Sequence, residues 1–395
     1  MRLAELLSYA DIAQLIHIAE TYDCRCNSHS KNDLIQSILH TALRRDAFAP
    51  HLDELSPEEW QLLHSLLFDN RDVFSSEELA ARAASAANHP SQSILSAGGG
   101  GGASVGANGE AAEATTASAA RSAIARFRRL GWLFGGISQQ TRFLYHMPLD
   151  VKQRLCETLE QRYRLLLEVR DEPPVYRDER GLFGDDIVTF LRYVRDYDVP
   201  LTTEGALYKR QLQQVLALMS VTETPPSGQG WRFGYGRRFK EYPDRFSLLY
   251  DYCYYHRLVE ERPDRLALTE AGYETAGGET RPDPAEVYRF WLRLYKGPVT
   301  NLHVLVQWIA RLAVDWVTER SLAAVLLPLV RPFYYDTVED VLERRVLRMM
   351  THLGLVQRGE TEQGEAVVRV TPHGRELVTG NRLAFEDTLW LPGMA

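Results

Sequence analysis

The stretch that decides the fold is Val338–Gly380, with the sequence VEDVLERRVLRMMTHLGLVQRGETEQGEAVVRVTPHGRELVTG. Its first part carries apolar residues at the spacing of one helix face: Val338, Leu342, Val346, Met349 and Leu353. Gly354 follows, and it predicts a helix end because glycine adopts positive φ without strain. Residues 355–358 and 367–370 then predict two short strands joined by a polar loop. A helix followed by a small antiparallel hairpin predicts the second half of a winged helix.

The composition indicates a folded protein of several domains. At 395 residues with 45% hydrophobic content, the chain can form two or three cores. Its formal net charge is −8, so any contact with nucleic acid must come from a local basic patch. The four cysteines show no disulfide pattern, which is typical of a reducing compartment. With no secretory segment and no long apolar run, we expect a cytoplasmic protein without a membrane partner.

The helix–hairpin pattern recurs along the chain, and this recurrence predicts the fold class. The predicted fold is mainly α with small β wings, made of tandem winged-helix units preceded by a helical SAP-like hairpin. The predicted parts are a SAP-like module at 1–48, a first winged helix at 56–150, a linking helix and second winged helix at 151–280, a third winged helix at 283–380, and a C-terminal tail at 381–395. A Gly/Ala/Ser-rich segment at 87–117 interrupts the first winged helix as a predicted flexible linker.

The module at 1–48 has two amphipathic helices around a short loop. Ser30 and Asp33 have the spacing of a capping box at the start of the second helix. A helix–loop–helix with a basic, capped second helix resembles the SAP-type DNA-binding motif, which places Lys31 among the predicted DNA-binding residues. The alternative is a helical hairpin whose only role is packing.

The strongest basic signal follows the glycine-rich segment. Between Ala114 and Leu149 there are five arginines and no acidic residue. A helical wheel of 118–130 puts Ala120, Ile124, Phe127 and Leu130 on one side, Ser122, Arg126 and Arg129 on the opposite side, and Arg121 and Arg128 on a flank. Arg142 lies in the predicted wing. Such a helix and wing predict contacts with DNA phosphates, and the alternative is a solvated arginine face.

A second basic segment occurs in the predicted second winged helix. In residues 231–240, four aromatic side chains alternate with four cations: Arg232, Arg237, Arg238 and Lys240. Aromatic rings stack on unpaired bases while cations hold phosphates, so the segment is a candidate single-strand contact. The alternative is a loop whose aromatic side chains are buried on the neighbouring helix. The wing that follows is acidic, and we expect it to avoid a phosphate backbone.

Residues 199–216, VPLTTEGALYKRQLQQVL, carry a resemblance to a known family. The segment resembles the N-terminal region of XPB-type DNA repair helicases, in which a turn with Thr and Gly leads into a helix with a Tyr-Lys-Arg cluster. The matching positions here are Thr203, Gly205, Tyr208, Lys209 and Arg210. Residues 347–359 and 368–380 are similar to the winged-helix ending of that family. The resemblance covers roughly 120–380, adds Lys209 and Arg210 to the predicted DNA-binding residues, and implies a protein that handles double-stranded or forked DNA or assists a superfamily-2 helicase.

The chain has no motif for catalysis. A GxxxxGK[ST] phosphate loop and a DExH box are both absent, so any helicase motor must be a separate chain. Cys24, Cys26 and His29 lack a convincing fourth zinc ligand, and no cofactor site is predicted. The predicted function is therefore a non-catalytic multi-winged-helix DNA-binding accessory protein that assists a separate XPB-type helicase in DNA repair or processing. The alternatives are a protein-interaction scaffold and a winged-helix transcription regulator.

Overall fold

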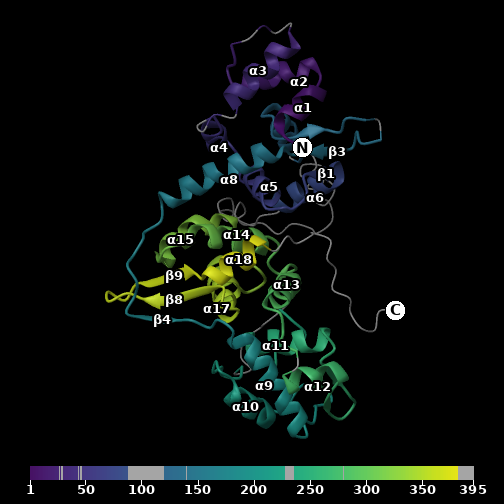
Figure 1. Ribbon diagram of the computed structural model, residues 1–395, viewed down its shortest axis with the longest axis vertical. Helices are drawn as coiled ribbons and strands as arrows, with labels where there is room; N and C mark the ends of the chain where they lie inside the picture. The colour runs from purple at the N-terminus through teal and green to yellow at the C-terminus, as the bar shows by residue number, and fades with distance from the viewer. Residues whose placement is uncertain are drawn as a thin grey trace, which may run out of the picture. The chain divides into compact units, whose positions relative to one another are not determined.

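The computed structural model describes residues 1–25, 27, 30–42, 44, 47–87, 120–138, 140–226, 235–278 and 280–380, without the side chains of 84–87. These residues form two compact units, and the boundary lies between Leu165 and Leu166 (Figure 1). The structure is mainly helical with small separate sheets, which confirms the predicted class at this level. Among the helices described, none has the length and apolarity to cross a bilayer.

The first unit is helical apart from one small sheet. Its elements are α1 (Leu3–Tyr9), α2 (Ile12–Thr21), α3 (Lys31–Ala42), α4 (Ala49–Asp53), α5 (Pro57–Leu67), β1 (Val73–Ser75), α6 (Ser76–Ala87), a helix at 120–129, β2 (Phe134–Gly135), β3 (Leu144–His146) and α8 (Leu149–Arg164). The antiparallel strands have the order β1-β3-β2, with Phe74 and Gly135 both opposite Tyr145. The predicted linking helix is α8, which packs on α1 and α5 within this unit.

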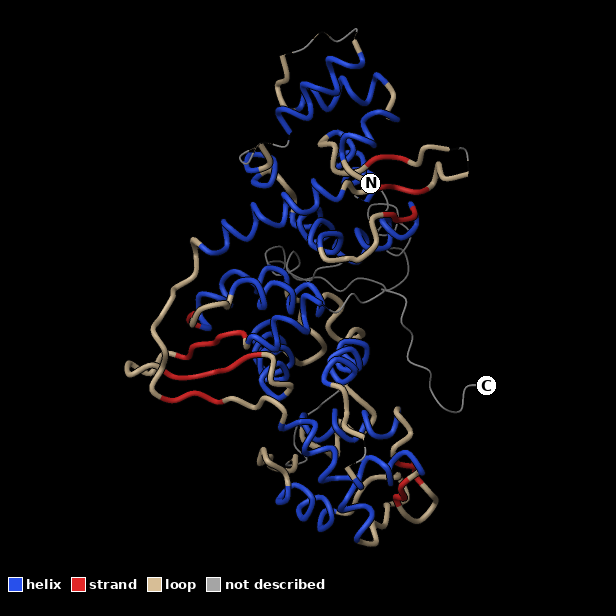
Figure 2. The backbone as a smooth tube through the Cα atoms, in the orientation of Figure 1, coloured by secondary structure: helices blue, strands red, loops and turns tan. Residues whose placement is uncertain are grey.

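The second unit contains two sheets among its helices (Figure 2). Its elements are β4 (Val175–Arg177), α9 (Leu182–Asp196), α10 (Lys209–Leu218), α11 (Asp244–Tyr255), β5 (Val259–Glu261), β6 (Leu266–Leu268), α12 (Glu270–Gly277), α13 (Pro284–Tyr295), α14 (Leu302–Leu312), β7 (Val317–Thr318), α15 (Glu319–Leu326), η2 (Leu327–Leu329), α16 (Val338–Asp340), η3 (Val341–Leu347), α17 (Arg348–His352), β8 (Val356–Glu360), β9 (Ala366–Val370) and α18 (Pro372–Gly380). β5 pairs with β6, and the larger sheet has the order β4-β8-β9-β7. Its edge strand β4 pairs with β8, with Val175 opposite Glu360.

The stretch 338–380 folds into the predicted helix and hairpin. α16, η3 and α17 form one continuous helix over 338–352, of which η3 is wound as a π-helix. β8 and β9 pair over five residues each, close to the predicted strands at 355–358 and 367–370. α17 packs on β8 and α15 packs on β9.

One order of elements occurs three times in the described residues. The order is helix, short extended segment, two helices and a two-stranded hairpin. The three copies are α5–β1–α6–helix 120–129–β2–β3, then α9–extended segment–α10–α11–β5–β6, and α14–β7–α15–helix 338–352–β8–β9. In each copy the first extended segment pairs at the second hairpin strand: β1 with β3, β7 with β9, and Pro200 with Arg265 immediately before β6.

The junction between the third helix and the hairpin has the same geometry in all three copies. A residue with left-handed backbone follows each helix: Gly131 (φ 66), Arg257 (φ 54) and Gly354 (φ 69). The next backbone N–H donates to the carbonyl five residues earlier, which is the hydrogen bond of a Schellman motif. The donor and acceptor pairs, each at 2.8 Å, are Trp132 and Phe127, Leu258 and Cys253, and Leu355 and Met350. The predicted helix end at Gly354 is confirmed.

A second recurring contact follows the hairpin in the two copies of the second unit. The hydroxyl oxygens of Thr269 and Thr371 accept hydrogen bonds from the backbone N–H groups of Gly272 and Gly374, at 3.1 and 2.8 Å. A Cβ on Gly374 would lie 2.1 Å from the carbonyl oxygen of Leu355, and the equivalent contact at Gly272 is as tight. Only glycine therefore lets α12 and α18 begin against the start of the hairpin.

The substitution Gly354→Ala is expected to lower the free energy of unfolding of the second unit by about 1–3 kcal/mol. Alanine would be strained at the left-handed φ of 69 that glycine adopts here. In addition, the new Cβ would lie 2.7 Å from Cα of Arg180. Urea unfolding followed by tryptophan fluorescence measures the change. The matched control is Gly380→Ala, which meets open space and is expected to change stability by less than about 1 kcal/mol.

At the equivalent position, Arg257→Gly should be no less stable than the wild type, because it removes a left-handed non-glycine residue that costs about 1 kcal/mol. Equal destabilisation by Gly354→Ala and Gly380→Ala would contradict the importance of this junction.

Candidate nucleic-acid interface

The helix at 120–129, here called the arginine helix, is held in the first unit through its apolar side. The buried residues of this side are Ala120, Ala123, Ile124, Phe127 and Leu130. At its C-terminal end, the Tyr22 hydroxyl donates to the Leu130 carbonyl at 2.9 Å and accepts a hydrogen bond from Trp132 Nε1 at 3.2 Å. Since Tyr22 belongs to the N-terminal helices, that module fixes one end of the arginine helix.

The opposite side of the arginine helix is exposed and basic. Its exposed residues are Arg121, Ser122, Ala125, Arg128 and Arg129. Residues three, four or seven apart share a helix face, so the five side chains form one surface, here called the basic face. No carboxylate of the described residues forms an ion pair with Arg128 or Arg129. The basic face thus has arginines around two small side chains, which allow another molecule to approach the helix backbone.

Arg126 has a different role from the one that the helical wheel predicted. Its guanidinium donates to the Glu59 carboxylate at 2.9 Å and to the Glu54 carbonyl at 2.8 Å, and also pairs with the Glu54 carboxylate at 3.2 Å. The side chain is only 25% exposed, at the edge of the basic face. Arg126 therefore fixes the arginine helix to the start of α5. The carboxylates of Glu54 and Glu59 balance its charge.

The hairpin after the arginine helix carries one further predicted cation. Arg142 is exposed in the connection between β2 and β3, and its guanidinium lies 4.5 Å from the ring centroid of Phe143. Phe143 is itself exposed. The hairpin thus offers a cation beside an aromatic ring, a combination that suits contact with phosphates and bases.

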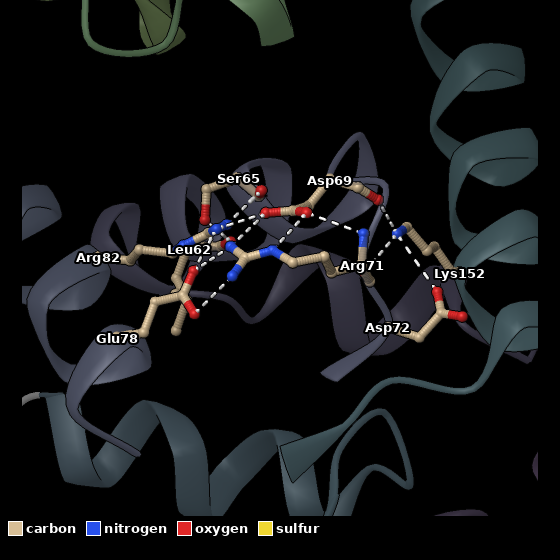
Figure 3. Close-up of polar contacts among 8 residues, drawn as sticks. All are labelled: Leu62, Ser65, Asp69, Arg71, Asp72, Glu78, Arg82 and Lys152. Atoms are coloured by element: carbon tan, nitrogen blue, oxygen red, sulfur yellow. Dashed lines mark hydrogen bonds and ion pairs between the residues drawn. The ribbon is translucent and has the colours of Figure 1, made fainter. Parts of the chain in front are cut away.

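Other basic side chains of the first unit are neutralised inside the fold (Figure 3). Asp69 receives hydrogen bonds from Arg71 Nε at 3.3 Å and from Arg82 Nη2 at 2.5 Å, and Arg82 also reaches Glu78 at 2.6 Å. Burial alone would raise the pKa of Asp69, but these hydrogen bonds outweigh it and lower the pKa. Lys152 of α8 donates to the Asp69 carbonyl. This network connects α5, α6 and α8 and is structural.

The predicted contact from the SAP-like module is also engaged within the chain. Lys31 Nζ donates to the carbonyl of Ser8 at 2.8 Å, which ties α3 to α1. Cys26 and His29 lie outside the described residues, and the described ones include no cluster of three or more metal-ligating side chains.

Two of the predicted cations in the second unit pair with one carboxylate. Arg237 binds both oxygens of Glu261, at 3.1 and 3.2 Å, and Arg238 lies 3.1 Å from the same carboxylate. Burial raises the pKa of Glu261, but the two arginines and Tyr250 outweigh it and lower the pKa. The basic loop thus folds onto the acidic strand β5, and both arginines are engaged within the chain by the same carboxylate. Lys240 is exposed near the Phe239 ring, and Arg232 lies outside the described residues.

Lys209 and Arg210 are placed at the start of α10, where both side chains are exposed. Tyr208 beside them is 50% exposed. Neither cation forms an ion pair with a described carboxylate. These three residues form a second, smaller exposed group, here called the Tyr-Lys-Arg cluster.

Sequence reasoning missed a buried carboxyl group near the basic loop. Asp251 of α11 is fully buried, and its Oδ2 accepts a hydrogen bond from the backbone N–H of Arg237 at 2.9 Å. Its Oδ1 has no hydrogen-bond partner among the described residues. Burial raises the pKa of Asp251 to about 7. An acidic residue within the apolar sequence around α11 was the only available signal.

A second missed feature is a buried charge cluster, of which Glu179 and His352 line a cavity of about 880 Å³. Arg245 lies 2.6 Å from Asp186, and Glu179 accepts a hydrogen bond from His352 Nδ1 at 2.9 Å. The same Glu179 also pairs with Arg177. Each of these carboxylates thus has a basic partner, so the cluster holds the second unit together and offers no unmatched charge to a ligand.

Replacing Arg126 by methionine is expected to lower the free energy of unfolding of the first unit by about 1 kcal/mol, because Glu59 loses a charged hydrogen-bond partner. The control Arg129→Met removes an exposed arginine and should change stability by less than about 0.5 kcal/mol. Urea unfolding followed by circular dichroism compares the two. The same stability in both variants would show that Arg126 does not support the helix.

The Asp251→Asn variant is expected to unfold less readily than the wild type above pH 7. The folded pKa of Asp251 lies above the unfolded value of 3.8, so the folded state binds more protons between these values and loses stability as pH rises through 7. The loss at pH 8 is on the order of 4 kcal/mol and is absent near pH 4. Unfolding of both proteins by urea at pH 5 and pH 8 measures it; a difference independent of pH would refute the assignment.

Neither protein-family models, nor curated proteins, nor solved structures gave a match to this chain. Two exposed groups stand out among the predicted sites: the basic face of the arginine helix, where Arg128 and Arg129 form no ion pair with a described carboxylate, and the smaller Tyr-Lys-Arg cluster. The other predicted cations for which the structure gives contacts mainly stabilise the fold.

Proposed function

We propose that this chain is a non-catalytic, multi-winged-helix DNA-binding accessory protein, and that the arginine helix is its main DNA contact. The observation that carries the proposal is the basic face, where Arg121, Arg128 and Arg129 surround Ser122 and Ala125. Small residues let a helix enter the major groove closely, while the surrounding guanidinium groups reach phosphates and base edges. Arg142 on the hairpin supplies a further phosphate contact.

The threefold order of elements supports the winged-helix part of the proposal. A winged helix is built from three helices and a hairpin, and a short strand after the first helix pairs at the hairpin. The sheet order β1-β3-β2 and the order β7-β9-β8 within the larger sheet both fit that description. The bridge between Pro200 and Arg265 fits it for the second copy.

The three copies offer very different third helices to a ligand. α11 is buried at every residue from Arg245 to Cys253, so it has no side free to enter a groove. The solvent side of helix 338–352 is charge-balanced, with Arg344 close to Asp340 and Arg348 close to Glu343. This comparison supports the proposal that the third helix of the first copy makes the DNA contact.

The resemblance of residues 199–216 extends the proposal to a partner. The chain would assist a separate XPB-type superfamily-2 helicase in DNA repair or processing, with the motor supplied by that helicase. Exposure of the Tyr-Lys-Arg cluster supports a role for this segment in contacts outside the chain. The second candidate is a protein-interaction scaffold, which is favoured by the charge-balanced third copy.

The double substitution Arg128→Gln/Arg129→Gln should weaken binding to duplex and forked DNA by at least tenfold. The slope of log K against log salt concentration should become less negative by about 2, because each lost phosphate contact contributes about 0.9. Fluorescence anisotropy of the full chain over a salt series measures both quantities.

The matched control is Arg281→Gln/Arg320→Gln, which removes the same charge from two arginines that are 82% and 78% exposed in the second unit. Its affinity and salt slope should stay at wild-type values. The DNA proposal fails if the wild type does not bind at low salt, or if both double variants lose affinity equally.

A further inference from the structure

A cavity of about 310 Å³ lies inside the second unit, where the first turn of α9 approaches the start of α13. This size is at the lower end of the range for small-molecule sites. Its apolar wall includes Phe183, Val287 and Leu355, all of which are buried. Gly181 and Gly184 also line it, and a Cβ built on either one meets no atom within 4 Å. The two glycines therefore leave space above the start of α9.

Three hydrogen-bond donors belong to residues that line this cavity and have no acceptor among the described residues. Tyr288 lines the cavity and is 1% exposed, and no described residue forms a hydrogen bond with its hydroxyl. The backbone N–H groups of Phe183 and Gly184 occupy the first turn of α9, where a helix has no acceptor of its own. The cap residue Gly181 has no side chain to accept from them, and no other described acceptor does so. A buried donor without a partner is costly, so the Tyr288 hydroxyl indicates a missing acceptor, and the two N–H groups of the half-buried first turn could share it.

The charges around the cavity favour an anion. The first turn of α9 lines the cavity and is the positive end of the dipole of this helix. Arg281 at the rim is 82% exposed and lies 4.0 Å from Asp185, so this loose pair leaves the guanidinium able to bind another carboxylate. His373 adds an imidazole to the lining. Asp185 is the only acidic side chain among the described lining residues.

We infer that this cavity binds a small monocarboxylate with an apolar body. The carboxylate accepts hydrogen bonds from the N–H groups of Phe183 and Gly184 and pairs with Arg281. The apolar body lies against Phe183, Val287 and Leu355, and the Tyr288 hydroxyl supplies the remaining donor. The inference does not depend on DNA binding, because every residue that it uses belongs to the second unit.

The test is isothermal titration of the full chain with three probe acids: octanoate, 4-phenylbutyrate and indole-3-acetate. At least one should bind with one-to-one stoichiometry, and its neutral amide should bind at least tenfold more weakly. The absence of binding by all three acids at millimolar concentration would overturn the inference, as would equal affinity for acid and amide.

Two variants test whether the acid binds in this cavity. Gly184→Leu puts a side chain into the open space and should abolish binding, while the control Gly297→Leu, at an exposed glycine that also has open space, should leave it unchanged. Thermal unfolding verifies that both proteins are folded, and leucine is a better helix former than glycine. Wild-type affinity in folded Gly184→Leu would overturn the assignment.

Two further variants test the chemistry. Arg281→Gln should reduce the preference for acid over amide by about tenfold, whereas Arg320→Gln should not alter it. Tyr288→Phe, which keeps the ring, should weaken acid binding severalfold. An unchanged preference in Arg281→Gln together with unchanged affinity in Tyr288→Phe would exclude the proposed binding mode.

Discussion

The hydrogen bond that closes each third helix is the constraint on which the rest of this structure depends. A left-handed residue turns the chain, and the following N–H donates back to the helix at 2.8 Å in all three copies. This turn sets the direction of the first hairpin strand, and the hairpin in turn pairs with the short strand that follows the first helix. Glycine provides the turn twice, while Arg257 adopts it in the second copy. The requirement is therefore for the backbone geometry, and glycine is only its least strained source.

With the backbone order fixed in this way, the copies differ in what covers their third helices. The arginine helix keeps an exposed side, on which Arg128 and Arg129 form no ion pair with a described carboxylate. α11 is enclosed, and Arg237 and Arg238 of the preceding loop both pair with Glu261 on the hairpin. The acidic wing that the sequence analysis noted thus has an intramolecular role. A chain of net charge −8 can still hold a local basic surface because its other cations are mostly matched inside the fold.

The sequence predicted features that depend on neighbours along the chain. The helix and hairpin of 338–380 and the helix end at Gly354 have local signals, and both are present. It could not predict which arginines are paired, because the partners Glu54 and Glu261 come from other elements. The helical wheel, which considers only one helix, therefore predicted that Arg126 lies on the exposed side. The sequence could not predict the cavity at α9 either, because its walls come from four separate parts of the second unit.

The pairing of β4 with β8 has a consequence for how the chain is made. β4 opens the second unit and β8 lies near its end, so Val175 finds its partner Glu360 only after almost the whole unit has left the ribosome. All of the second copy, from α9 to β6, lies between these two strands in the sequence. Its contacts are more local, so it can fold first, and the late strand pairing then closes a long loop around it. The second copy is thereby an insertion, in the sequence, between two paired strands of one sheet, so the second unit is not a simple series of separate segments.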